Sequence, residues 1–268
     1  YDDYKSYQAA YEESYAAAKD ELYTGGYRIY TSLDPAKQEI LQSAVDQVLS
    51  FDAETADNGI YALQGAAVAV NNDTGLVEAI VGGRSQETST YTLNRAFQSF
   101  RQPGSSIKPL IVYAPALEEG YASFSSVKDI NVDAAKEPKA DVASLPGNWI
   151  TLRQAVEKSR NGAAWWLFNE VTPEEGLSYL TQMQFDKIVP DDYNMAASLG
   201  GFTYGVTAEE MAGAFSALEN GGVYREPDCI VRMENLAGED IYTGREPKEV
   251  YSQQTAAVMV DVMKGVIS

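Results

Sequence analysis

The 268-residue sequence contains no histidine, and this absence removes most familiar forms of acid–base catalysis. A Ser-His-Asp triad, a Cys-His dyad and histidine-ligated zinc are all excluded. A proton shuttle must therefore be a lysine, aspartate, glutamate, tyrosine or serine side chain. Cys229 is the single cysteine, which excludes an internal disulfide and a cysteine-rich metal site. We expect neither a metal nor a cofactor.

Basic residues are also scarce, because 20 lysines and arginines face 39 aspartates and glutamates. The resulting net charge of −19 is a poor match to phosphate backbones, so nucleic acid is not an expected partner. No run approaches the roughly 18 apolar residues of a membrane span, and no signal peptide is recognisable. The chain opens without methionine and stops just after an apolar segment. We therefore expect it to be a piece of a longer protein.

Residues 1–60 predict a small α/β region that precedes the main domain. Residues 2–22 contain helix formers without glycine or proline, and a short alternating segment then predicts a strand. Asp34 and Pro35 predict the start of a second helix, as its N-cap and its first residue. We interpret this region as a linker and residues 61–268 as the main domain.

The main domain reads as strands, then a helical block, then strands, which predicts an α+β fold with an antiparallel sheet. Residues 65–83 predict a hairpin, residues 120–150 resemble a loop, and residues 229–244 predict a second hairpin. A last apolar helix should run from residue 253 to the end of the chain. Capping boxes predict three helices, which begin at Thr151, Thr172 and Thr207.

The stretch 100–110, FRQPGSSIKPL, carries the clearest candidate chemistry. A helix can begin after the Pro-Gly turn, so that Ser105 lies in the first turn, where free N–H groups favour negative charge. Lys108, three residues on, lies on the same helix face. Burial favours the neutral amine of a lysine, and a neutral amine can take a proton from a hydroxyl. Ser106 is the competing nucleophile, but it lies off the face of Lys108.

Ser-x-x-Lys is a weak motif, since this chain contains a second copy at Ser125 and Lys128. No turn precedes that copy and no helical pattern follows it, so context favours the first copy. A second candidate element follows the helix that begins at Thr151. Ser159 and Asn161 either mark the end of that helix before a new helix begins, or they project together from a tight turn into a cleft, where they would relay a proton and hold a substrate amide.

Taken together, these segments resemble the transpeptidase domain of class A penicillin-binding proteins, which has the serine β-lactamase-like fold. The resemblance covers nearly the whole chain. It is carried by five segments in the order of the family, which are residues 25–45, 63–83, 94–121, 199–222 and 258–268.

The resemblance implies a role for each candidate residue. Ser105 would be the nucleophile, Lys108 its base, Ser159 a proton relay and Asn161 a substrate contact. The acyl donor would be a peptidoglycan stem peptide that ends in D-Ala-D-Ala, and β-lactams would acylate the same serine. The protein would act at the outer face of the bacterial cytoplasmic membrane, anchored by an N-terminal segment not present here, and its parent would also carry a glycosyltransferase.

One departure from the family is clear. Its third motif, Lys-Thr-Gly or Lys-Ser-Gly on an edge strand, is absent, and the only Lys-Gly, at Lys264, falls inside the last predicted helix. The C-terminal part of the domain, with the strands that complete the sheet, would therefore be missing. We expect little turnover from the isolated chain.

Two alternatives stay open at this point. A D,D-carboxypeptidase or β-lactamase of the same fold would use water as the acceptor. A sensor or structural module would instead keep the fold and trap β-lactams without catalysis.

Overall fold

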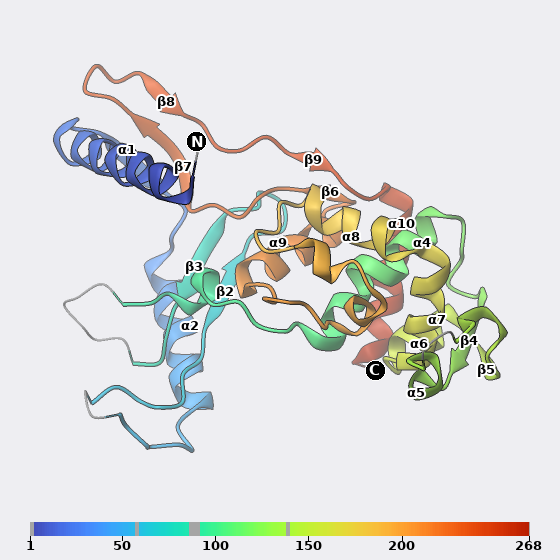
Figure 1. Ribbon diagram of the computed structural model, residues 1–268. Helices are drawn as coiled ribbons and strands as arrows, with labels where there is room; N and C mark the ends of the chain where they lie inside the picture. Colours follow the sequence, from blue (N-terminus) through green and yellow to red (C-terminus); the bar gives the residue numbers. More distant parts are fainter. Residues whose placement is uncertain (1–2, 57–58, 86–91, 138–139, 268) are drawn as a thin grey trace. The chain divides into compact units, whose positions relative to one another are not determined.

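A computed structural model shows that the chain forms two compact units (Figure 1). The first consists of residues 1–32 and 228–245, and the second of residues 33–227 and 246–268. The structure describes residues 3–56, 59–85, 92–137 and 140–267.

The first unit pairs strands from distant parts of the sequence. Strand β1 joins the predicted β7–β8 hairpin in a three-stranded antiparallel sheet of order β1-β7-β8, in which Arg28 lies opposite Glu234. The predicted first helix and strand are both confirmed, and Asp3 caps the helix through a capping box with Ser6. The elements are α1 (Tyr4–Thr24), β1 (Arg28–Thr31), β7 (Ile230–Glu234) and β8 (Asp240–Tyr242).

The second unit contains the other predicted elements. Its helices are α2 (Pro35–Val48), α3 (Arg95–Gln98), α4 (Ala114–Glu118), α5 (Val132–Ala135), α6 (Leu152–Glu157), α7 (Asn161–Val171), α8 (Pro173–Gln182), α9 (Ala208–Glu219) and α10 (Gln253–Met263). Its strands are β2 (Ala67–Val70), β3 (Val77–Val81), β4 (Ser126–Ile130), β5 (Gly147–Thr151), β6 (Val223–Tyr224) and β9 (Lys248–Glu249). Short 3₁₀ turns are η1 (Gly104–Ile107), η3 (Val142–Ser144), η4 (Pro190–Asp192), η5 (Met195–Leu199) and η6 (Lys264–Val266), and η2 (Pro109–Tyr113) is a π-helical turn.

The sequence predicted the starts of helices in this unit better than its loops. Asp34 caps α2 by accepting from the N–H groups of Ala36 and Lys37, and β2 and β3 form the expected antiparallel hairpin. The loop-like reading of residues 120–150 is wrong, because β4 and β5 pair there in an antiparallel ladder. This pairing links residues about twenty apart through an irregular connection, so no turn signal announces it.

The core of the second unit is a block of helices around the segment that follows the candidate lysine. Ile107, Leu110 and Tyr113 are completely or almost completely buried there, against apolar side chains of α6 to α10. An element buried on every side is typical of the centre of a helical block. The segment therefore has no solvent-facing side over most of its length, unlike an amphipathic surface helix.

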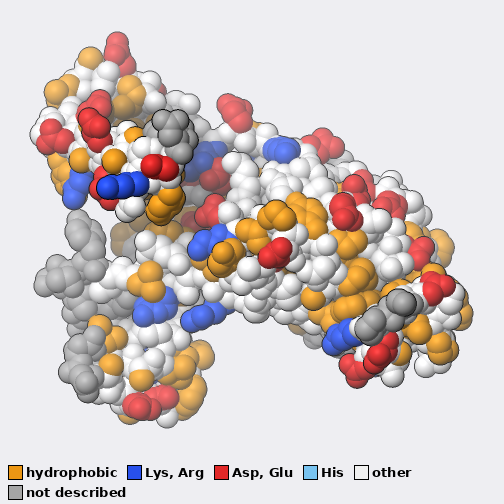
Figure 2. Space-filling model, viewed as in Figure 1, with side chains coloured by type: hydrophobic (Ala, Val, Ile, Leu, Met, Phe, Trp, Pro, Cys, Tyr) orange, Lys and Arg blue, Asp and Glu red, His pale blue; other side chains and the backbone are white. Residues whose placement is uncertain are grey.

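The charge imbalance of the sequence is visible on the surface. Figure 2 shows acidic side chains over much of the visible face of both units, with fewer lysines and arginines among them. Across the described ranges, no helix combines the length and the apolar character that crossing a bilayer requires. The predicted division of the chain at residue 60 stays a prediction, and the compact units have other limits, at residues 32, 227 and 245.

Candidate active site

The candidate nucleophile lies in a 3₁₀ turn at the surface of the second unit. Gly104 begins η1 with a φ of +57°, and Ser105 follows it with an exposed side chain. Gly200 packs directly on this turn, because a Cβ atom there would lie 2.3 Å from the backbone N of Gly104. The preceding strand-like residue Arg101 pairs with Val206 through backbone hydrogen bonds of 2.9 and 2.8 Å. The serine is therefore held on a backbone with little freedom to move.

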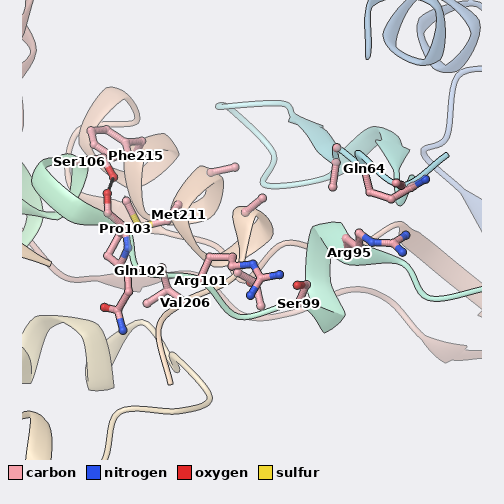
Figure 3. A pocket seen from close by; sticks show the side chains of 16 residues that line it. Gln64, Arg95, Ser99, Arg101, Gln102, Pro103, Ser106, Val206, Met211 and Phe215 are labelled. Carbon is pink, nitrogen blue, oxygen red and sulfur yellow. Dashed lines mark hydrogen bonds between the residues drawn. The ribbon is translucent and has the colours of Figure 1, made fainter. Parts of the chain in front are cut away.

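Ser105 and Ser106 differ in what their hydroxyls contact. The Ser106 hydroxyl donates to the backbone carbonyl of Pro103 at 2.7 Å, as Figure 3 shows. The Ser105 hydroxyl has no hydrogen-bond partner among the residues that the structure describes. A hydroxyl that is exposed and uncommitted is the better nucleophile, so this geometry favours Ser105, as the sequence predicted.

Lys108 lies one turn deeper than Ser105, and its side chain is only 1% exposed. Its amine donates to the backbone carbonyl of Ser159 at 3.0 Å, to the Ser159 hydroxyl at 3.3 Å and to the Oδ1 atom of Asn161 at 2.6 Å. These three acceptors match the three N–H groups of an ammonium. The structure thus brings three predicted residues together around one nitrogen. The backbone N–H of Lys108 donates to the carbonyl of Ser105, but within the described part of the chain the Lys108 amine has no hydrogen bond to the Ser105 hydroxyl, although both residues line one cavity.

The turn that carries Ser159 and Asn161 is sharp. Helix α6 ends at Glu157, Ser159 has a φ of +46°, and α7 begins at Asn161. A serine in the left-handed region costs about 1–2 kcal/mol. Such strain persists only where surrounding contacts fix the backbone, and it is often found at active sites. Both predicted alternatives apply in part, since one helix ends and another begins here, and the turn between them also brings both side chains to the Lys108 amine.

A π-helical turn follows Lys108 and places Tyr113 in the same cavity. The N–H of Ala114 donates to the carbonyl of Pro109, five residues earlier, in place of the usual four. Pro109 and Pro115 have no N–H of their own, so an ordinary helical ladder is interrupted on both sides of this turn. In α-helical geometry Tyr113 would point away from Lys108. The wider turn brings it to the same cavity instead.

Two cavities meet at the nucleophile turn. The smaller one, of about 340 Å³, contains Ser105, Lys108 and Ser159 and is otherwise mainly apolar, with Tyr113 and Phe215 in its wall. The larger one, of about 720 Å³, shares Ser106 and Phe215 with it. Figure 3 shows residues that line this larger cavity, among which are Gln64, Arg95, Arg101 and Met211. An extended ligand could therefore pass along the exposed side of Ser105.

Burial lowers the pKa of Lys108 to about 8, and the negative charge of Asp129 opposes this shift. Burial disfavours the ammonium because the charge loses its water. A lysine with a pKa near 8 has a useful fraction of neutral amine at neutral pH, as a general base requires.

The second Ser-x-x-Lys copy has a structural role. The Ser125 hydroxyl accepts from the N–H of Ala122, and Lys128 in β4 donates to the carbonyl of Ala143. The Lys128 amine also lies 5.4 Å from the ring centre of Trp149. This serine and lysine have separate partners, so the structure gives no support to a site at the second copy.

Sequence reasoning missed Asp129 and Arg160, which form an ion pair beside the Ser159–Asn161 turn. Arg160 is the middle residue of the segment Ser159–Asn161, and Asp129 lies about thirty positions earlier in the sequence. Nothing in the spacing could join the two, because the pairing depends on the unpredicted strand β4.

Comparison with known proteins identifies the family of this chain. The family model of the penicillin-binding protein transpeptidase domain matches residues 65–268. The chain therefore belongs to the penicillin-binding protein transpeptidase family, and the class A resemblance and the predicted fold class are both confirmed. Penicillin-binding protein 4 of Bacillus subtilis is 32% identical over 264 residues, which cover 96% of this chain and 40% of that protein. Penicillin-binding protein 1A of Pseudomonas aeruginosa is 36% identical over 206 residues, which cover 74% of this chain and 24% of that protein.

Solved structures share the fold at lower identity. PonA1 of Mycobacterium tuberculosis, in complex with penicillin V, has a TM-score of 0.70 at 20% identity, and the match covers 91% of this chain and 65% of that one. Penicillin-binding protein 1A of Haemophilus influenzae has a TM-score of 0.71 at 22% identity, with 96% of this chain and 56% of that chain covered. The chain thus spans well under half the length of the curated relatives named above.

Proposed function

We propose that this chain is the acylating part of a peptidoglycan D,D-transpeptidase, in which Ser105 forms an acyl-enzyme. The observation that carries the proposal is the position of the buried Lys108 amine, held by Ser159 and Asn161 in the cavity that Ser105 lines. Membership of the transpeptidase family supports the same reaction.

In the proposed reaction the neutral amine of Lys108 takes the proton of the Ser105 hydroxyl. The serine oxygen attacks the penultimate D-Ala carbonyl of the stem peptide. As the bond to the terminal D-Ala breaks, Ser159 gives its proton to the departing nitrogen and takes in return the proton that Lys108 holds. Asn161 offers its amide to the peptide backbone, and the N–H of Ser105 stabilises the oxyanion. An amine of a neighbouring stem peptide then takes the acyl group from Ser105.

We further propose that β-lactams acylate Ser105 and leave it slowly. Penicillin-binding protein A of Mycobacterium tuberculosis, solved as an imipenem acyl-enzyme complex, has a TM-score of 0.69 to this chain at 19% identity.

The rest of the parent protein is also a matter of proposal. We propose that it is longer than this chain, carries a glycosyltransferase, and is anchored at the outer face of the bacterial cytoplasmic membrane. The limited share of each relative that the chain covers supports a longer parent. Under this proposal residues 1–60 link two domains, and the third motif lies in a part outside residues 61–268. The isolated chain should then turn over little substrate.

The rate of acylation should rise with pH around the pKa of Lys108, which is about 8. Only the neutral amine can act as the base, so the rate should increase about tenfold per pH unit below pH 8 and level off above it. The measurement is the rate constant for labelling of the intact parent by a fluorescent penicillin between pH 6 and pH 10. A rate that falls over this range would contradict a lysine base.

Product analysis tests the proposed function. We expect the intact parent, given a peptide ending in D-Ala-D-Ala and an acceptor amine, to release D-Ala and join the peptide to the amine. A hydrolysed peptide as the only product would indicate a D,D-carboxypeptidase, and rapid hydrolysis of penicillin a β-lactamase. Labelling at Ser105 without release of D-Ala would indicate the sensor or structural module.

A further inference from the structure

The ion pair between Asp129 and Arg160 joins strand β4 to the turn that holds the Lys108 amine. The Nε atom of Arg160 donates to the Oδ2 atom of Asp129 at 2.7 Å, and its Nη2 atom donates to the same oxygen. The Asp129 side chain is 8% exposed, whereas that of Arg160 is 52% exposed. Arg160 stands between Ser159 and Asn161, so the arginine that binds β4 is flanked by both residues that contact Lys108.

Close packing shows that this contact continues through the backbone. A Cβ atom on Gly162 would lie 2.0 Å from the carbonyl oxygen of Ile130 and 2.5 Å from the Oδ1 atom of Asp129. The first turn of α7 is therefore pressed against the end of β4, and only glycine fits there. Ser159, three residues earlier, has the unfavourable positive φ that needs outside support. The ion pair and the glycine contact together supply that support from one side.

Few charged groups face the Lys108 amine. Asp129 faces it from β4, and the negative charge of Asp129 raises the pKa of Lys108. Ser105 in η1 and Tyr113 in η2 line the same cavity. A serine hydroxyl carries no charge, and burial raises the pKa of Tyr113, so its side chain is also neutral in the working pH range. The residues that α6, α9 and α10 contribute to the same cavity are apolar, namely Val156, Phe215 and Met263. Lys158 and Arg160 lie in the turn itself, and Lys158 lines a polar cavity with Asp129. Glu157, which ends α6 just before the turn, forms an ion pair with Arg153.

We infer that Asp129 and Arg160 are positioning residues for acyl transfer: they fix the Ser159–Asn161 turn against β4 and thereby hold the amine of Lys108 in place. Their opposite charges also balance each other beside that amine. The inference rests on the proposed function, since it assigns the pair to the lysine base of that reaction. Neither residue needs to touch the substrate.

Single substitutions that remove one charge and leave a polar amide test the effect of the pair on the position and on the pKa of the Lys108 amine. In Asp129→Asn the positive charge of Arg160 is no longer balanced, which disfavours the ammonium of Lys108, so the midpoint of the pH profile should move to lower pH. In Arg160→Gln the negative charge of Asp129 is unbalanced, and the midpoint should move to higher pH. We expect each shift to be roughly half a unit to one unit. The plateau rate at high pH should fall about tenfold in both variants, because the turn loses its support.

The experiment measures the acylation rate of the intact parent by fluorescent penicillin from pH 6 to pH 10, with thermal unfolding of each variant as a check on folding. The double variant Asp129→Asn/Arg160→Gln should restore the midpoint while keeping the low plateau. Arg232→Gln is the matched control, since Arg232 of β7 forms its ion pairs with Glu234 and Asp240, which belong to the first unit. Its profile should match that of the unmodified protein.

The outcomes distinguish this inference from the proposed function. If the unmodified parent is labelled at Ser105 and both single variants keep its profile, the inference is wrong and the function stands. Lower plateaus without opposite midpoint shifts in folded variants would also overturn it, because they would indicate a general structural role. If the unmodified parent is not labelled at Ser105, the proposed function itself fails.

Discussion

Replacing Ser105 by alanine is expected to abolish covalent labelling of the protein by penicillin. The reaction needs an oxygen nucleophile at this position, and loss of a catalytic serine commonly lowers rates by far more than about a thousandfold. The Ser105 side chain is exposed at the surface of η1, so the loss of one oxygen should leave the fold intact. The measurement is labelling of the intact parent by a fluorescent penicillin, followed by peptide mapping of the adduct.

Two other serines, at positions 106 and 125, provide matched controls for this experiment. Ser106→Ala removes a hydroxyl that already donates to the carbonyl of Pro103, so labelling should remain within a fewfold of the unmodified protein. Ser125→Ala affects the second Ser-x-x-Lys copy and should leave labelling unchanged. An adduct mapped to Ser106 or Ser125 in the unmodified protein would show that the nucleophile is assigned to the wrong residue.

Replacing Lys108 by methionine should lower the acylation rate by about a hundredfold to ten-thousandfold, the usual contribution of a general base. Methionine has a similar length, so it should fill the space that the lysine chain occupies. Folding places this side chain where its pKa falls to about 8, which means that the folded state disfavours the ammonium. At neutral pH the neutral side chain should therefore cost little stability or even raise it.

Lys128→Met is the control for the base assignment, because Lys128 belongs to the copy of the motif that lies in β4. It should lose the contact with Trp149 and keep full labelling. Thermal unfolding of both lysine variants shows whether each is folded. A folded Lys108→Met protein that is labelled at the normal rate would rule out Lys108 as the base.

The sequence was most informative where the chemistry is local. Asp34 and Thr151 cap their helices as their spacing indicates, and Lys108 follows Ser105 by one turn. These features depend on residues three or four positions apart, so they can be read directly from the sequence. The tight turn at Ser159 was one of two readings, since a serine with positive φ has no distinct sequence signal.

The features that could not be predicted depend on contacts between distant segments. Strand β4 exists because it pairs with β5, and Asp129 meets Arg160 only because β4 packs beside α7. The π-helical turn Pro109–Tyr113 lies between two interruptions of the helical ladder, at Pro109 and Pro115, but neither proline indicates a wider turn in place of a simple break. Of the candidate site, the sequence could name the four candidate residues, but not the ion pair between Asp129 and Arg160 that lies beside them.

The sheet of the first unit has a consequence for how the protein is divided in the laboratory. Strand β1 pairs with β7, which comes about two hundred residues later, so a fragment trimmed at residue 60 would lose one neighbour of β7. That strand would then present unpaired backbone groups, a frequent cause of aggregation in recombinant fragments. An expression clone intended to isolate the second unit should therefore retain residues 28–31, or remove β7 and β8 together with them.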